Sequence, residues 1–312
     1  MSSAPVFESI GVAIPQSTNA ALDIGALRRY LQRAEALGFD SLWVTEQMFG
    51  PGPRLDALSL LTYAAALTSR PRLIAGILLS ALRSPVLLAK STATLDRLSG
   101  GRVVLGVGQG GDASVYPAIG VPAEGRGARF DAGLRLLKRL WTEKRISDEN
   151  AFWTIRDQML EPKPLQRPHP PLWFGGSNPR ALGRAVEIGD GWIGAGAAPP
   201  ARFAEEHELL LRTLAAAGRD PTGFTIAKRL YVAVGDRARA LRRAGEWFAS
   251  TYHGRDPSTV QEICIIGTPD ECAEAIRRVA AGRATHLALS PVHDEAEQLE
   301  IFGEALLPRL KD

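Results

Sequence analysis

A glycine-rich turn is the stretch of this chain best suited to hold a ligand. Gly106, Gly108, Gly110 and Gly111 follow the apolar run 103–105. That run has no helical spacing and is typical of a strand buried on both faces. Glycine permits positive φ and lets another group approach the backbone closely. Because α/β proteins bind ligands where such strands end, we expect this turn to form one wall of a ligand site.

A second glycine turn has the features of an anion site. Gly175, Gly176 and Ser177 precede Asn178-Pro179, which predicts a helix with Asn178 at the N-cap and Pro179 at its first position. A helix N-terminus offers N–H groups and the positive end of the helix dipole, and paired glycines let a phosphate reach them. The alternative is a tight turn that binds nothing.

Glu46 ends an apolar stretch that we expect to be the second strand. A carboxylate there could act as a general acid or base if its pKa is raised, or it could form a salt bridge to Arg83 across the barrel mouth. Gln47 can form hydrogen bonds but cannot transfer protons, so it could only position a ligand. Ser80 and Arg83 follow the third expected strand and face the same site.

Other catalytic groups are missing from the sequence. The five histidines are scattered, without the spacing of a metal site, and there is no G-x-S-x-G motif. Cys264 and Cys272 are expected to be small apolar residues. A phosphate seat and a carboxylate without a strong intrinsic catalyst suggest that a cofactor performs the chemistry.

Strands and helices alternate along the chain. The first four expected strands begin near residues 8, 40, 73 and 103, and four more are expected at 171–176, 190–196, 225–234 and 285–291, each followed by a helix. This pattern predicts one domain, residues 1–312, folded as a (β/α)8 TIM barrel with insertions after strand four and between strands seven and eight. The first insertion includes a stretch expected to form a hairpin over the barrel end.

A dinucleotide-binding fold is the alternative, since Gly106, Gly108 and Gly111 fit G-x-G-x-x-G. That motif belongs in the first strand–helix turn of such a fold, whereas here it follows the fourth strand.

Composition restricts the partners and the compartment. Lys+Arg number 37 and Asp+Glu 34, a net charge of +3, without a run of like charges, so we expect no nucleic-acid partner. The sequence has no 18-residue apolar run and no signal-peptide pattern at its start. We therefore expect a cytoplasmic protein without a membrane span.

Several segments resemble the luciferase-like flavin and deazaflavin oxidoreductases, and they occur in the family's order. They are EALGFDSLWVTEQ (35–47), LRSPVLLAKSTATLDRLSGGRVVLGVGQG (82–110), RGARFDAGLRLLKRLWTE (126–143), PPLWFGGSNPRALGRAVEIGDGW (170–192) and IIGTPDECAEAI (265–276). The resemblance implies a (β/α)8 barrel, often dimeric, that binds FMN or coenzyme F420 across its C-terminal face. The G-V-G-x-G turn is similar to the F420-dependent branch.

The resemblance also implies roles for particular residues. Gly175, Gly176 and Ser177 would hold the cofactor phosphate. The Ile77–Leu78 bond lies where the family often bulges its third strand with a non-prolyl cis peptide behind the ring. The other residues implied to bind the cofactor are Ser80, Gly106, Val107, Gly108 and Gln109.

Two positions differ from the family's pattern. Many relatives have a histidine where this chain has Gln47, and the sugar-phosphate dehydrogenases have a glutamate where it has Gly111, next to Asp112. These differences argue against oxidation of a sugar alcohol. They favour an F420-dependent reductase that delivers hydride to an activated C=C or C=N bond of a small molecule, with Glu46, Asp112 or water supplying the proton.

Two other functions remain open from the sequence. One is an FMN-dependent monooxygenase that uses O2 and a partner flavin reductase. The other is a flavin-binding or structural barrel without catalytic activity, for which the loss of the family histidine at Gln47 is the argument. A homodimer is expected in each case by the resemblance.

Overall fold

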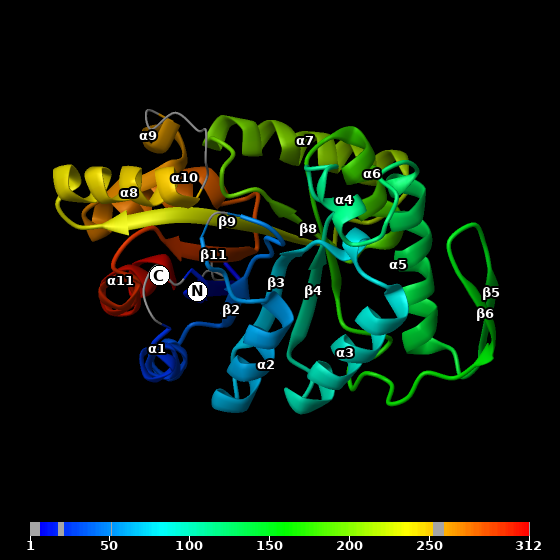
Figure 1. The fold of residues 1–312 in the computed structure, drawn as a ribbon. Coiled ribbons are helices and arrows are strands. Elements are labelled where there is room, and N and C mark those ends of the chain that lie inside the picture. The colour runs from blue at the N-terminus through cyan, green and yellow to red at the C-terminus, as the bar shows by residue number, and fades with distance from the viewer. Residues whose placement is uncertain (1–6, 18–21, 51, 252–258, 312) are drawn as a thin grey trace, which may run out of the picture.

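Eight parallel strands close into a barrel. The computed structural model describes residues 7–17, 22–50, 52–251 and 259–311. The strands pair in the order β1, β2, β3, β4, β7, β8, β9, β11, and β11 pairs with β1 again to complete the circle. The expected TIM barrel is therefore confirmed (Figure 1). The barrel strands are β1 (Ser9–Ala13), β2 (Ser41–Val44), β3 (Arg72–Leu78), β4 (Val103–Val107), β7 (Leu172–Gly175), β8 (Gly191–Gly194), β9 (Thr225–Val234) and β11 (His286–Pro291).

The second insertion contains a strand that the sequence analysis did not predict. β10 (Cys264–Gly267) pairs in parallel with residues 231–234 of β9, while residues 225–228 of β9 pair with β8. β9 is long enough to serve both neighbours, and Figure 1 shows it extending beyond the barrel. Cys264 and Cys272 are both buried and free, as expected of small apolar residues, and burial raises the pKa of each thiol.

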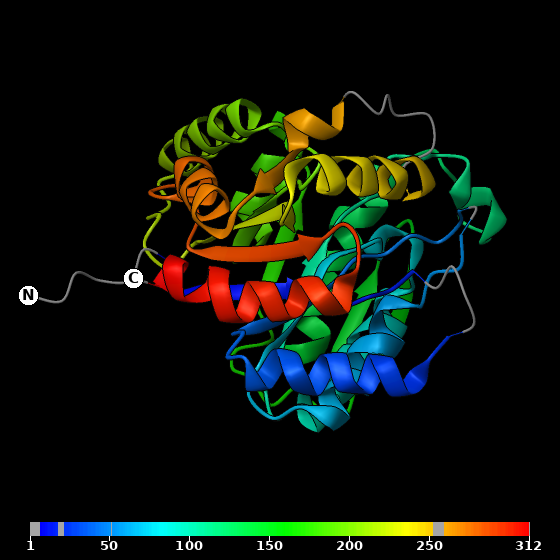
Figure 2. The ribbon, with the colours of Figure 1, turned by 90° about the vertical axis from the view of Figure 1, so that its left-hand side faces the viewer.

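Helices surround the barrel, and α1 and the C-terminal helices lie side by side (Figure 2). The predicted N-caps are present: Asp56 accepts a hydrogen bond from the Ser59 N–H at 2.9 Å, and Asn178 accepts one from the Ala181 N–H at 3.0 Å. The helices are α1 (Ile24–Ala36), α2 (Ala57–Leu67), η1 (Ser80–Leu82), α3 (Pro85–Leu98), α4 (Val115–Ala118), α5 (Arg126–Thr142), α6 (Pro179–Ile188), α7 (Pro200–Ala216), α8 (Arg237–Thr251), α9 (Val260–Ile263), α10 (Pro269–Ala280), α11 (Glu295–Ile301), η3 (Phe302–Leu306) and α12 (Leu307–Lys311).

The first insertion forms the expected hairpin in a different place. β5 (Ile146–Glu149) and β6 (Thr154–Gln158) pair antiparallel. Trp153 at its tip packs against α5, where a Cβ on Gly133 would lie 3.2 Å from the indole and the Arg129 guanidinium lies 4.6 Å from a ring centroid. The hairpin therefore lies on the outer side of α5 and not over the barrel end (Figure 1), because its partly buried Trp153 indole packs against that helix.

Side chains fill the barrel interior. The buried interior cluster comprises Trp43, Ile74, Val104, Trp173, Ile193, Ala227 and Ala288, with Ile77 packed against it from the C-terminal end. Over the ranges that are described, we find no helix of the length and apolarity needed to cross a membrane.

Candidate functional site

The third strand is irregular at its C-terminal end, one bond away from the expected position. The non-prolyl cis peptide joins Gly76 and Ile77, not Ile77 and Leu78, and the β3–β4 register shifts between Ala75 and Leu78. A Cβ on Gly76 would lie 2.7 Å from the Trp43 ring. Glycine is therefore needed where the backbone passes this buried indole, and the irregular bond follows that glycine.

The Ile77 side chain occupies the space that two of the predicted ligand-binding glycines leave open. A Cβ on Gly108 would lie 2.1 Å from Ile77 Cδ1, and one on Gly175 would lie 2.9 Å from Ile77 Cγ2. Gly106 is equally enclosed, since its Cβ would lie 2.2 Å from the Ala75 carbonyl oxygen. These glycines are required first by packing inside the protein, with Ile77 forming the floor of the barrel mouth.

Two other predicted ligand-binding residues direct their side chains away from the mouth. Leu78 and Val107 are fully buried in the core between the strands and the surrounding helices. Their backbones meet at the mouth, where the Leu78 carbonyl oxygen accepts a hydrogen bond from the Gly108 N–H at 2.9 Å. Any contact of Leu78 or Val107 with a ligand would therefore be through the backbone.

The turn after β7 has the geometry expected of an anion seat. Gly176 has φ +94°, and a Cβ there would lie 3.0 Å from the Ala181 side chain at the start of α6. The Trp192 indole N–H donates to the Gly176 carbonyl oxygen at 2.8 Å, and the same indole stacks on Phe203. A fixed, side-chain-free turn at a helix N-terminus fits a phosphate group. The sequence analysis did not identify the role of Trp192, which follows only from this contact.

Polar groups of α6 and of the turn after β4 meet beside the first turn of α5. A Cβ on Gly127, in the first turn of α5, would lie 3.1 Å from Arg184 Nη2 and 3.5 Å from Gln109 Nε2. The Tyr116 hydroxyl donates to the Gln109 carbonyl oxygen at 2.6 Å and fixes the β4 turn. Arg184 forms an ion pair with Asp131 at 2.5 Å. Arg184 was not a sequence candidate, because its position on α6 gives no signal of proximity to the β4 turn.

Glu46 is held in an ion pair at the mouth. Its carboxylate contacts the Arg83 guanidinium and accepts a hydrogen bond from the Leu79 N–H at 2.6 Å, and its side chain is only 4% exposed. Arg83 also contacts Asp56 at 3.1 Å. The salt bridge that the sequence left open as an alternative is thus present, and both oxygens of Glu46 have donors.

The other polar candidates, Asp112, Gln47 and Ser80, differ in exposure and in hydrogen-bond partners. Asp112 is exposed and accepts hydrogen bonds from the Ser114 N–H and hydroxyl, which hold the pKa of its carboxyl below the ordinary value. Gln47 accepts a hydrogen bond from Arg54 at 3.2 Å. Ser80 is buried, and its hydroxyl has no hydrogen-bond partner in the described part of the chain. The structure therefore places Asp112 at the surface and Ser80 beside a small cavity that Arg83, Arg129 and Trp153 also line.

The opposite side of the mouth contains groups that the sequence analysis did not select. A cavity there is lined by Trp43, Gly76, Arg229, Ser290 and Glu295, among others. The Arg229 guanidinium donates to the Ser290 hydroxyl at 2.9 Å. Because β9, β11 and β3 are far apart in sequence, residue spacing alone could not bring these side chains together.

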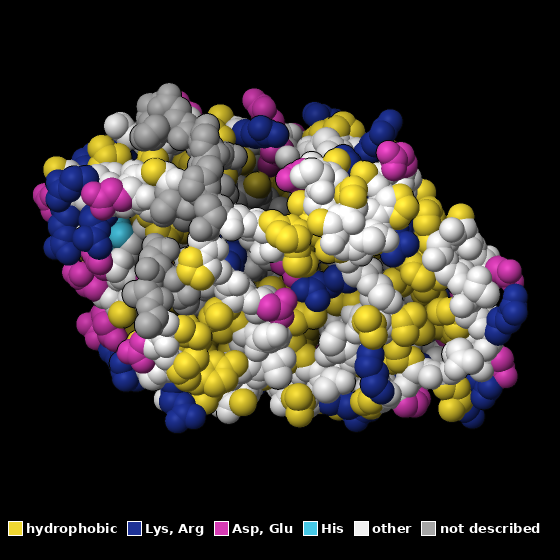
Figure 3. Space-filling view, in the orientation of Figure 1, with side chains coloured by type: hydrophobic (Ala, Val, Ile, Leu, Met, Phe, Trp, Pro, Cys, Tyr) yellow, Lys and Arg dark blue, Asp and Glu magenta, His cyan; other side chains and the backbone are white. Residues whose placement is uncertain are grey.

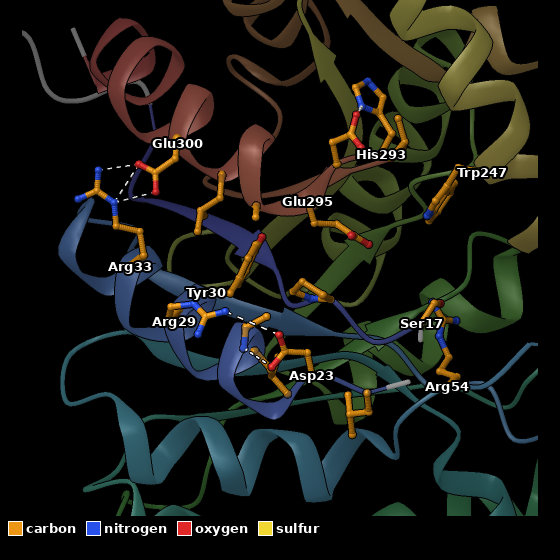
Figure 4. Close-up of a pocket in the computed structure, with 18 of the residues that line it drawn as sticks. Ser17, Asp23, Arg29, Tyr30, Arg33, Arg54, Trp247, His293, Glu295 and Glu300 are labelled. Carbon is orange, nitrogen blue, oxygen red and sulfur yellow. Dashed lines mark hydrogen bonds and ion pairs between the residues drawn. The ribbon is translucent and has the colours of Figure 1, made fainter. Parts of the chain in front are cut away.

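A groove of about 1360 Å³ adjoins this cavity and runs between α1 and α11. Figure 4 shows Tyr30 and Arg33 on α1 facing Glu295 and Glu300 on α11, with Ser17, Arg54 and Trp247 at the other end. The cavity and the groove share Pro15, Ser17, Arg54, Trp247 and Glu295 in their linings. Among the residues the structure describes, no group of three His, Cys, Asp or Glu side chains could hold a metal ion.

Comparisons with known proteins agree with this architecture. The luciferase-like monooxygenase family matches residues 8–286. The chain is 30% identical to an F420-dependent glucose-6-phosphate dehydrogenase of Beutenbergia cavernae, over 91% of this chain and 93% of that protein. It is 28% identical to an FMNH(2)-dependent dimethylsulfone monooxygenase of Pseudomonas putida, over 93% and 89% of the two chains.

Solved structures show the same fold. The monooxygenase RslO1 from Streptomyces bottropensis superposes with a TM-score of 0.80 at 27% identity, over 96% of this chain and 99% of that one. An F420-dependent secondary alcohol dehydrogenase in complex with an F420-acetone adduct superposes with a TM-score of 0.81 at 22% identity, over 98% and 100% of the chains.

Proposed function

Because this chain belongs to the luciferase-like monooxygenase family, whose members here are oxidoreductases using F420 or FMN, we propose that it is an F420-dependent reductase. Its substrate is a small molecule with an activated C=C or C=N bond. The observation that carries the proposal is the turn at Gly176, which has φ +94° and stands at the N-terminus of α6, where it suits a phosphate-bearing cofactor. The similarity of the G-V-G-x-G turn at 106–110 to the F420-dependent branch favours F420 over FMN.

The protein's own residues would bind and orient the cofactor. The backbone around Gly176 and the N-terminus of α6 would hold its phosphate, and Ile77 would support the ring from below. When bound, the reduced deazaflavin supplies a hydride. The buried walls of the mouth keep water away from this transfer.

The contacts of the Glu46 carboxylate favour reduction of a double bond over oxidation of a sugar alcohol. Oxidation of an alcohol requires a base that accepts the hydroxyl proton, and a carboxylate fixed by Arg83 and the Leu79 N–H is poorly suited to accept it. Gln47 cannot accept it either. We therefore propose that Glu46 and Gln47 organise the mouth without transferring protons.

An FMN-dependent monooxygenase is the alternative, supported by relatives of nearly equal similarity. The dimethylsulfone monooxygenase is 28% identical and the F420-dependent dehydrogenase 30% identical. Both cofactors carry a phosphate that the same turn could bind. The turn is therefore equally compatible with a monooxygenase that uses FMN, O2 and a partner flavin reductase.

A binding titration tests the choice of cofactor. We expect tight quenching of F420 fluorescence by the protein and much weaker binding of FMN. Gly176→Val should weaken F420 binding at least tenfold, because a side chain at φ +94° would distort the turn and meet Ala181. Gly183→Ala is the matched control on α6, since nothing lies within 4 Å of its Cβ position.

Each other outcome has a defined consequence. Preference for FMN would replace the proposal with the monooxygenase and lead to oxygen-consumption assays. Tight F420 binding without hydride transfer to any acceptor would support the inactive barrel.

We also propose a cytoplasmic homodimer. Large exposed apolar side chains on α3 and on the connector after β6 support a second copy as partner: Leu87 is 70% exposed, Leu98 65% and Met159 51%. Figure 3 shows hydrophobic side chains gathered over this part of the molecule. Sedimentation velocity should show a dimer for the wild type and a monomer for Leu87→Glu.

A further inference from the structure

Glu295, in the first turn of α11, reaches the barrel mouth across β1 from Glu46, because β11 and β2 both pair with β1. It lines the cavity that contains Gly76 and Trp43, and it also lines the large groove between α1 and α11. Figure 4 shows its carboxylate extending from α11 into the space between Tyr30 and Trp247. Glu295 thus lies where a molecule entering by the groove would meet the mouth.

The carboxylate of Glu295 differs from the others near the mouth in its partners. No ion pair joins it to a cation within the described ranges, whereas Glu46 and Asp56 both contact Arg83. Burial raises the pKa of the Glu295 carboxyl and outweighs a hydrogen bond from the residue's own backbone N–H, which lowers the pKa, and the neighbouring charge of Asp294 raises it as well. A carboxyl in this setting retains its proton to higher pH than a solvated one.

The charges around Glu295 come from several elements. Tyr30 on α1 donates its hydroxyl hydrogen to the Ala13 carbonyl oxygen at 2.9 Å, and its own pKa is raised by burial and by Glu295. Asp294 contacts His293, Arg239 and Arg243. The other charged side chains that line the two cavities are Asp23, Arg29, Arg33, Arg54, Arg229, Glu246 and Glu300.

We propose that Glu295 is the catalytic acid of the reductase, a role that rests on the proposed function. A hydride, carrying two electrons, adds to the electron-poor atom of the double bond. The π electron pair moves to the neighbouring atom and takes the proton of the Glu295 carboxyl. The carboxylate regains a proton from water by way of the groove. A bound reduced F420 would supply the two electrons as the hydride, and its remaining proton would be released to solvent.

The first test needs no cofactor. Infrared titration of the wild type should show the carbonyl stretch of a protonated carboxyl persisting above the ordinary pKa of glutamate. The band should be absent in Glu295→Gln and present in Glu297→Gln, a control on the same helix whose side chain is 57% exposed. If the band is unchanged in Glu295→Gln, the proton belongs to another group and the proposal is wrong.

The second test measures turnover with reduced F420 and cyclohexenone as an activated alkene. Loss of a general acid typically costs about 100-fold or more, so Glu295→Gln should lower kcat by at least that much, with F420 affinity unchanged. It should also abolish the fall in activity with rising pH that deprotonation of Glu295 causes in the wild type. Glu297→Gln should remain within twofold. Full activity in Glu295→Gln would show that Glu295 is not the acid, while the proposed reductase function would still hold. No turnover by the wild type, in a screen that includes imines, overturns the reductase and the acid role with it.

Discussion

Glu46 and Glu295 reach the same barrel mouth from positions just after the two strands on either side of β1, and their surroundings differ. Glu46 sits at the end of β2 with a guanidinium on one oxygen and a backbone N–H on the other. Glu295 sits at the start of α11, beside Tyr30 and a groove, and no ion pair to it is found among the described side chains. The same functional group is thus a structural anchor on one side and a proton carrier, as we propose, on the other.

This difference shows that the position of a carboxyl at a strand end does not determine its role. A cation and hydrogen-bond donors stabilise the ionised form of a carboxyl, whereas burial and a neighbouring negative charge stabilise its protonated form.

Glu46→Gln should destabilise the protein by about 3 kcal/mol, because it leaves Arg83 largely buried beside a neutral partner. Urea unfolding of the variant and the wild type measures this difference. Gln47→Ala, one residue along, should lie within about 0.5 kcal/mol of the wild type. An equally small change for Glu46→Gln would mean that Asp56 alone satisfies Arg83.

Gly108→Ala should cost about 2 kcal/mol, since the new methyl group would overlap Ile77 Cδ1. Adding Ile77→Val removes that atom and should recover about 1 kcal/mol, a coupling that a double-mutant cycle measures. Gly111→Ala is the control in the same turn, because its Cβ position has no neighbour within 4 Å. Strict additivity of the two substitutions would contradict the packing role of Gly108.

Asp56→Ala should cost about 1 kcal/mol by removing the N-cap of α2. Burial raises the pKa of Asp56, but the hydrogen bonds from Ser59 and the Arg83 charge outweigh it and hold the pKa below the ordinary value. The ionised form therefore stabilises the fold above the ordinary pKa of aspartate, about 3.9. The deficit of Asp56→Ala should shrink as the pH falls below that value, whereas a constant deficit would exclude a contribution from the charge.

Asp112→Asn should have the smallest effect, within about 0.5 kcal/mol in stability and twofold in turnover. The side chain is exposed, and asparagine can form the same turn with Ser114. Thermal unfolding and steady-state kinetics are the measurements. A large loss of turnover would return Asp112 to the list of proton donors and weaken the assignment to Glu295.

The sequence by itself determined the barrel and the places where its turns lie. Apolar runs alternating with helical patterns are local signals, and each strand–helix unit repeats them, so eight repeats specify the closed sheet. Helix caps at Asp56 and Asn178 were equally local, because a cap depends on residues within one turn. The sequence analysis did not predict β10, because its four residues lie within an insertion and form a strand only by pairing with the C-terminal half of β9.

Only the tertiary structure decided what the mouth contains. The sequence shows that Gly108 and Gly175 are glycines, but Ile77 from another strand fills the space beside both of them. It offers Glu46 as a carboxylate, but only the structure shows that Arg83 and the Leu79 N–H occupy its two oxygens. Glu295 carried no signal at all, because its place at the mouth depends on how the last strand and helix close the barrel against the first, a contact between residues nearly 300 positions apart.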